Sequence, residues 1–152
     1  MEAGPAAVTL KAVAARMGRT HANLLHHFGS AAGLQRALTL NLAESACNEV
    51  ALHMGDNPVG GGDIARIVDV TFDAFGREGG GALASWMMMT GNEDGFDPIV
   101  EAIQSLLNSR SKDPDAMQLL REDTLALVLM AVGDALVAQM GAAYGELVRA
   151  EA

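Results

Sequence analysis

Thr20–His27 is a run of side chains that could do chemistry, with one threonine, one asparagine and three histidines. Their hydroxyl, amide and imidazole groups can hydrogen-bond to base edges or phosphates, and an asparagine can pair bidentately with adenine. The histidines could instead ligate a metal. However, His21 and His26 are five residues apart, a poor spacing for one helical face, and no cysteine or carboxylate lies nearby. The run therefore favours polar contacts with a nucleic acid over metal binding.

No arrangement typical of a catalytic site can be named elsewhere in the chain. Cys47 and His53 are six residues apart and do not form a plausible catalytic pair, and no Ser-His-Asp set is apparent. The glycine triplets at 60–62 and 79–81 separate helical segments and lack the motif of a phosphate-binding loop. We therefore expect no enzymatic activity, no cofactor and no bound metal.

Two short helices joined by a turn would position the polar run. Apolar residues at helical spacing predict one helix over 10–17, capped by Thr9, and a second over 21–28, capped by Thr20. Gly18 permits the sharp turn between them, because glycine takes a positive φ at little cost. This is the layout of a helix-turn-helix, whose second helix normally lies in the major groove of DNA.

These residues resemble the DNA-binding domain of the TetR family of bacterial one-component regulators. The matching positions occur in the family's order without a gap, and they are Thr9, Val13, Ala14, Gly18, Thr20, Leu24, His27, Phe28, Ser30 and Leu34. The resemblance implies that Thr9 lies near a phosphate and that His27 packs beside Phe28. It also implies that the DNA-facing residues include Arg19, Thr20, His21, Asn23 and His26. Among these, Asn23 is the strongest candidate for reading a base.

Three positions depart from the family's pattern. Leu25 stands where the family usually has a tyrosine that reaches a phosphate, Ala31 where it usually has a lysine, and Arg19 where it usually has an apolar residue. Each lost cationic contact should lower the salt slope of DNA binding by roughly one unit. The family's domain also begins with a further amphipathic helix, for which the residues before Thr9 are too few. We therefore expect a DNA-binding domain over 1–40 that lacks its first helix.

Charge is distributed unevenly along the chain. Residues 1–40 hold four basic residues and one acidic residue, a net charge of +3. Residues 41–152 hold six basic and eighteen acidic residues, a net charge of −12. A basic reading head on an acidic body would show this asymmetry, and chance segregation in a short segment is the alternative. Arg36 in particular could be an ordinary solvated helix residue.

The remainder of the chain predicts helices alone. Apolar residues at helical spacing indicate a helix over 31–53 and a second that Asp63 caps and the glycines at 79–81 end. Further helices are indicated over 82–90, from 97 onward, and over 116–149 with a break near Gly141. Proline and glycine at 56–62, and the glycines at 79–81, predict breaks between helices. No stretch alternates as a strand would. The predicted fold class is all-α, with a helix-turn-helix head followed by a helical domain over 41–152 that, by the resemblance, binds a ligand and dimerises.

Residues 124–140 are apolar on nearly every face. The stretch is shorter than the ~20 residues that span a bilayer, and Asp134 and Gln139 interrupt it. A buried or intersubunit helix is the better interpretation, because a second copy related by a two-fold axis would cover the surplus apolar face. We therefore expect no membrane contact and a homodimer through the C-terminal helices, bound to a palindromic operator in double-stranded DNA. Core packing within a monomer is the alternative.

Large apolar side chains of the later helices predict a ligand cavity. Those expected to line it are Phe72, Phe75, Trp86, Met87, Met88, Met89 and Met130, with Asp134, Gln139 or Tyr144 as a polar handle. A dry core is the alternative for most of these residues individually. The expected effector is a small apolar or amphipathic molecule.

The sequence therefore predicts a ligand-responsive transcriptional regulator, a repressor that an effector releases from its operator by favouring the wrong separation of the two heads. The alternative is a small-molecule-binding or interaction module that derives from such a regulator and whose DNA contacts have decayed. We expect a cytoplasmic protein, because the single Cys47 excludes an intrachain disulfide and no signal peptide is visible.

Overall fold

The computed structural model describes residues 9–55, 62–91 and 93–150, and the side chains of those residues as far as Gly141, except that of Glu93. The helices are α1 (Leu10–Arg16), α2 (His21–Phe28), α3 (Ala31–His53), α4 (Ile64–Phe75), α5 (Gly80–Thr90), the 3₁₀ helix η2 (Glu93–Phe96), α6 (Asp97–Arg110) and α7 (Pro114–Ala150). Within the described ranges no strand forms, and Met54 and Gly62 make an isolated β-bridge. The prediction of an all-α fold is confirmed. Most of the break predicted at 56–62 lies outside the described residues, as do residues 1–8.

A hydroxyl side chain caps the start of each of the first three helices. The hydroxyl oxygens of Thr9 and Thr20 each accept a hydrogen bond of 3.2 Å from the backbone N–H three residues later in the chain. The Ser30 hydroxyl oxygen accepts the equivalent hydrogen bond at 3.0 Å. Gly18 and Gly29, which precede α2 and α3, have φ of +61° and +71°, a conformation that favours glycine. Short-range sequence signals therefore fix the path of the chain through this region.

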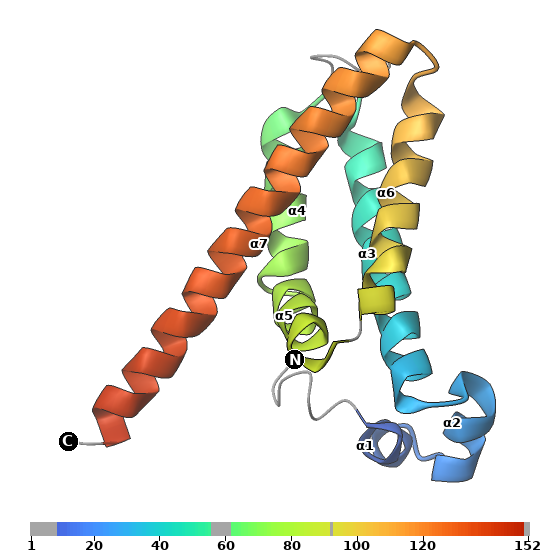
Figure 1. The fold of residues 1–152 in the computed structure, drawn as a ribbon, viewed down its shortest axis with the longest axis vertical. Helices are drawn as coiled ribbons and strands as arrows, with labels where there is room; N and C mark the ends of the chain where they lie inside the picture. The colour runs from blue at the N-terminus through green and yellow to red at the C-terminus, as the bar shows by residue number, and fades with distance from the viewer. Residues whose placement is uncertain (1–8, 56–61, 92, 151–152) are drawn as a thin grey trace.

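Helix α3 connects the small N-terminal helices to the rest of the molecule (Figure 1). It begins next to α2 and runs up the body, where it packs against α4 and α6. Its bounds match the predicted helix over 31–53. The boundary predicted between residues 40 and 41 therefore falls inside one continuous helix.

The second glycine triplet was predicted to separate two helices, and this is wrong for Gly80 and Gly81, which belong to α5. Gly79 caps α5 with a φ of +88°. A Cβ on Gly81 would lie 2.5 Å from the Cβ of Ala135, so the absence of a side chain lets α5 approach α7 closely. The triplet therefore serves helix packing as well as the turn.

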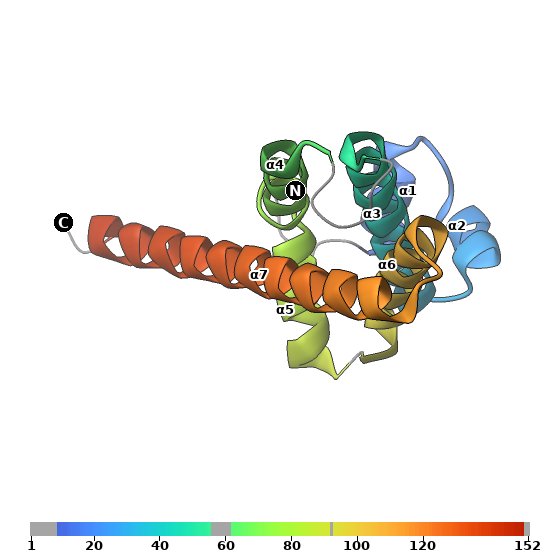
Figure 2. The same ribbon diagram turned by 90° about the horizontal axis from the view of Figure 1, so that it is seen from above.

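Helix α7 is continuous from Pro114 to Ala150, so the predicted break near Gly141 is wrong. Its C-terminal half extends away from the other helices (Figure 2). An 18-residue window within Pro114–Gly141 has a mean hydropathy of 1.7, so this segment could cross a bilayer by length and composition. The helix is thus longer than the apolar stretch over 124–140 that was judged too short to span. The core helix of a soluble protein, which is mostly buried, meets the same criterion, whereas only 11% of this apolar window is buried.

Candidate DNA interface and ligand cavity

A small apolar core holds α1, α2 and the start of α3 together. Leu24 is only 2% exposed and lies among Leu10, Ala14 and Leu34, with Val13 and Phe28 packed around them. Leu24 and Phe28 are four residues apart, so they share one face of α2 and leave the opposite face to solvent. The contact of this one face fixes the orientation of α2.

All six residues predicted to face DNA are exposed: Thr9, Arg19, Thr20, His21, Asn23 and His26. The capping hydroxyls of Thr9 and Thr20 act as acceptors, so each keeps its O–H to donate to an outside group. His27, expected beside Phe28, is exposed, and its ring lies edge-on to that of His26 with centroids 6.0 Å apart. The solvent face of α2 therefore carries hydrogen-bonding side chains.

The basic residues of the head do not all face solvent in the same way. Arg36 donates a hydrogen bond of 2.9 Å to the backbone oxygen of Asp94, and its Nη1 lies 3.6 Å from Oδ2 of Asp97. It thus joins α3 to the start of α6. Lys11, in the first turn of α1, and Arg19, in the turn before α2, are both exposed. The net charge of the head therefore overstates the positive charge available to an outside ligand.

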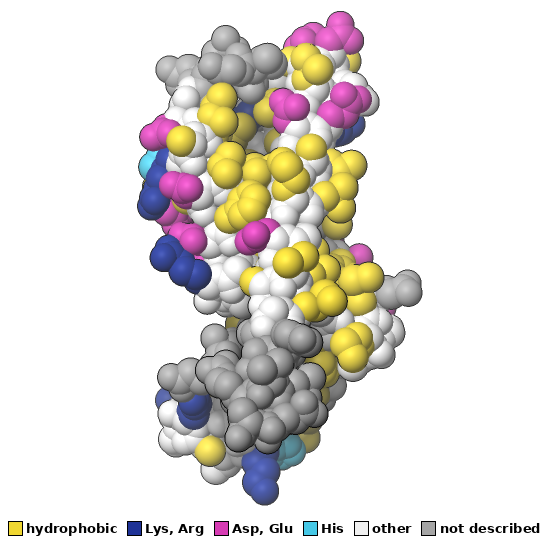
Figure 3. Space-filling model, turned by 90° about the vertical axis from the view of Figure 1, so that its left-hand side faces the viewer, with side chains coloured by type: hydrophobic (Ala, Val, Ile, Leu, Met, Phe, Trp, Pro, Cys, Tyr) yellow, Lys and Arg dark blue, Asp and Glu magenta, His cyan; other side chains and the backbone are white. Residues whose placement is uncertain are grey.

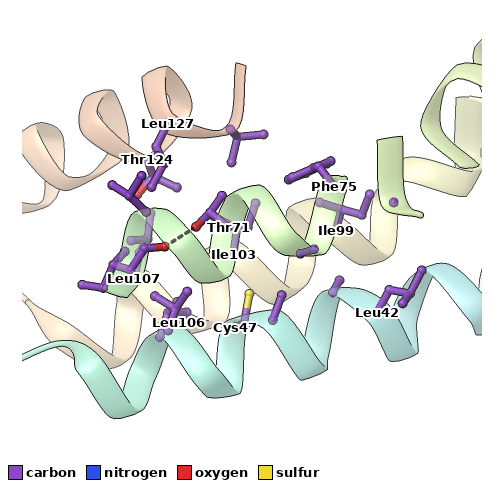
Figure 4. Close-up of a pocket in the computed structure, with 18 of the residues that line it drawn as sticks. Leu42, Cys47, Thr71, Phe75, Ile99, Ile103, Leu106, Leu107, Thr124 and Leu127 are labelled. Atoms are coloured by element: carbon purple, nitrogen blue, oxygen red, sulfur yellow. Dashed lines mark hydrogen bonds between the residues drawn. The ribbon is translucent and has the colours of Figure 1, made fainter. Parts of the chain in front are cut away.

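A cavity of about 400 Å³ lies in the body between α3, α4, α6 and α7, with α5 at one end (Figure 4). Helix α3 contributes one continuous stripe of lining residues, which consists of Thr39, Leu42, Ala43, Ala46, Cys47 and Val50. The alternating spacing of three and one keeps this stripe on one face of the helix. Ala43 and Ala46 are small, and this leaves room between α3 and the helices opposite it.

Two of the six predicted ligand-binding residues, Phe75 and Met130, line this cavity. The other four do not, and they are Phe72, Trp86, Met89 and Asp134. Helix α5 buries Leu83, Ala84 and Met87, which leaves Met89 85% exposed on the other side.

The further candidates of the sequence also divide between the two environments. Met87 lines the cavity, whereas Met88 is exposed and lines a second groove. Gln139 is exposed, and the side chain of Tyr144 lies outside the described residues. The aromatic and methionine residues of α4 and α5 therefore do not by themselves show which face of each helix points into the cavity.

Sequence reasoning missed the polar residues of the cavity. Thr39 and Thr71 donate their hydroxyl hydrogens to backbone oxygens of their own helices, at 3.0 and 2.8 Å, so each oxygen can still accept a hydrogen bond. Asp123 is the charged residue among the described lining residues. The spacing of residues 39–50 is the signal that could have revealed the α3 side of this cavity.

Cys47 lines the cavity from α3 (Figure 4). Burial raises the pKa of its thiol, because desolvation disfavours the charged thiolate. The group therefore stays protonated at neutral pH and contributes to the lining as a small apolar side chain. Across the described part of the chain, no three His, Cys, Asp or Glu side chains gather as a metal site requires.

Comparison with known proteins adds no relative. No family model matches the chain, and no curated protein or solved structure matches it.

Proposed function

We propose that this chain is a DNA-binding transcriptional regulator whose affinity for DNA is controlled by a small ligand. The observation that carries the proposal is the geometry of α1 and α2: two short capped helices, joined through Gly18, whose shared core leaves the outer face of α2 open. His21, Asn23 and His26 lie on this exposed helix with no buried role. A helix held in this way can enter the major groove and present amide and imidazole groups to base edges.

Helix α3 supplies a physical route between ligand and DNA. Leu34 belongs to the core of the head, while residues from Thr39 to Val50 of the same helix line the cavity. A ligand that changes how α3 packs against α4 and α6 would therefore tilt the head as one unit with its helix. Such a ligand releases DNA if it binds more tightly to the arrangement in which the two heads are wrongly spaced.

Apolar residues exposed on α7 support a homodimer. Leu129, Val137 and Met140 are 62%, 69% and 72% exposed. Figure 3 shows hydrophobic side chains gathered in a band along α7 and between α7 and α4. A second copy related by a two-fold axis would bury this band and present two heads to a palindromic site.

The proposal is tested by selecting duplexes from a random pool with the full chain and sequencing those retained. A palindromic motif is expected. Asn23→Ala should then weaken binding to the selected duplex by roughly fivefold to 150-fold, the cost of losing one bidentate base contact. Asn48→Ala is the matched control, because Asn48 is an exposed asparagine on α3 outside the head. Failure to enrich any sequence would contradict the proposal.

One observation favours the alternative, a ligand-binding module without DNA binding. Leu25 is an apolar side chain 42% exposed on α2, and Ala31 at the start of α3 offers no charge. Neither can hydrogen-bond to a phosphate. A folded dimer that binds a small ligand but selects no duplex would establish this alternative.

A further inference from the structure

A second apolar space adjoins the cavity. This outer groove of about 400 Å³ is formed by α5, α6 and α7 together with Phe75 at the end of α4. It shares six lining residues with the cavity, and they are Phe75, Ile99, Ile103, Leu107, Thr124 and Val128. The two spaces therefore meet along one common wall, where α6 faces α7.

Loose packing of α6 against α7 makes this wall thin. Helix α6 packs mainly on α3, whereas α7 packs mainly on α4 and α5. The two helices converge at their connection and splay apart beyond it (Figure 1). From the cavity side, Figure 4 shows Ile99, Ile103 and Leu107 on α6 and Thr124 on α7. Side chains alone thus separate the groove from the cavity, so a slender apolar chain could pass between them.

The outer groove has a polar end and an apolar end. Arg121 and Gln104 line it, and Arg121 makes no ion pair with any described residue. Gln104 lies six residues before the end of α6, and Arg121 lies seven residues after the start of α7. These antiparallel neighbours therefore stand at a similar level near the connection. Ala84 and Met88 of α5 line the apolar end.

We infer that the outer groove and the cavity together hold one elongated amphipathic carboxylate, a fatty acid. Its carboxylate lies at Arg121 and Gln104, and its alkyl chain runs along the groove and passes between Ile99 and Val128 into the cavity. The inference rests on the proposed function, because it names the effector class of the proposed regulator.

Charge sets the class and the direction of this ligand. A guanidinium can hold a carboxylate through two parallel hydrogen bonds, and the Gln104 amide can donate another. Asp123 borders the inner cavity and would repel a carboxylate there, so the charged end faces the groove. The two spaces have volumes typical of small-molecule sites, and their lining is predominantly apolar.

Calorimetric titration of the full chain with octanoate, decanoate, dodecanoate and tetradecanoate, without DNA, tests the inference. Each added methylene that enters an apolar space should tighten binding by up to about fourfold. Arg121→Gln should weaken binding of dodecanoate by roughly tenfold and leave dodecanol unaffected. Lys112→Gln is the matched control, because it removes a nearby charge that lines neither space.

Val128→Phe tests passage through the wall. It should abolish the gain from octanoate to dodecanoate by filling the space between the groove and the cavity. Val137→Phe makes the same change at an exposed position of α7 that lines neither space, so it should keep the gain. Circular dichroism identifies any variant that fails to fold, and the exposed Arg121→Gln variant then decides the outcome.

Three results would overturn the inference: no affinity for any of the acids, equal loss of dodecanoate and dodecanol binding in Arg121→Gln, or tighter binding of dodecylamine than of dodecanoate. Fatty acid binding by a chain that selects no duplex would refute the proposed regulator and leave this site standing. Selection of a duplex by a chain that binds no fatty acid would refute the fatty acid site and leave the proposed regulator standing.

Discussion

Replacing Gly33 with alanine should destabilise the head, although the same change normally strengthens a helix. Gly33 is the third residue of α3, and a Cβ added there would lie 2.0 Å from the carbonyl oxygen of Phe28. Ordinary contact begins at 3.4 Å, so backbone atoms would have to separate by about 1.4 Å. The obstacle is backbone, and it belongs to the turn in which Gly29 has a φ of +71°. No side-chain rotation can therefore relieve the clash.

The size of the effect follows from two opposing contributions. Exchange of glycine for alanine within a helix stabilises it by about 1 kcal/mol. Overpacking costs about 1–3 kcal/mol, and more where the backbone must move. Because backbone atoms must move, we place the overpacking cost at about 3 kcal/mol or more, so the net effect of Gly33→Ala is to lower the free energy of unfolding by about 2 kcal/mol or more. Gly133→Ala, where nothing lies within 4 Å, should raise it by about 1 kcal/mol.

Thermal melting followed by circular dichroism measures the difference. For a chain of this length, about 1 kcal/mol corresponds to a shift in Tm of roughly 2–4 °C. Gly133→Ala should melt above the parent and Gly33→Ala below it, with faster tryptic cleavage at Arg16 and Arg19 in the head. A Gly33→Ala variant that melts with or above Gly133→Ala would refute the close approach of the α2–α3 turn.

Three further experiments, two substitutions and one chemical labelling, test the head and the cavity separately. Leu24→Ala should cost about 2–5 kcal/mol of head stability, because Leu24 is 2% exposed, and should abolish DNA binding in an anisotropy assay while fatty acid binding persists. Cys47 should react slowly with iodoacetamide at neutral pH and faster as the pH rises toward its raised pKa, and bound dodecanoate should slow the reaction further, as mass spectrometry would measure. Ala46→Phe should fill the cavity and weaken binding of long-chain acids in calorimetry, whereas Ala138→Phe on the exposed side of α7 should not.

The sequence predicted best those features that a few neighbouring residues determine. The hydroxyl caps at Thr9, Thr20 and Ser30 lie at the expected starts of α1, α2 and α3. The bounds of α3 and the start of α4 follow from their caps and from the spacing of their apolar residues, whereas α4 ends at Phe75, before the glycine triplet at 79–81. These are local effects, because a cap bonds only to backbone two or three residues away.

The lining of the cavity was harder to predict, because it depends on how the helices face one another. Phe72 and Phe75 are both apolar on α4, yet only Phe75 reaches the cavity. Met89 was predicted to line the cavity because it belongs to a run of three methionines, but α5 turns its side chain toward solvent. Gly141 suggested a break, and α7 continues through it because a single glycine costs a helix only about 1 kcal/mol. No short-range signal contains the orientation of one helix relative to another.

The most direct test of DNA regulation is the ratio of affinities for the selected duplex and for a scrambled duplex, measured by fluorescence anisotropy at two salt concentrations. A regulator is expected to prefer the selected duplex by about a thousandfold or more, and to lose affinity for both duplexes as salt rises. Equal affinity for the two duplexes, or no saturable binding by a chain shown to be folded and dimeric, would contradict the proposed function.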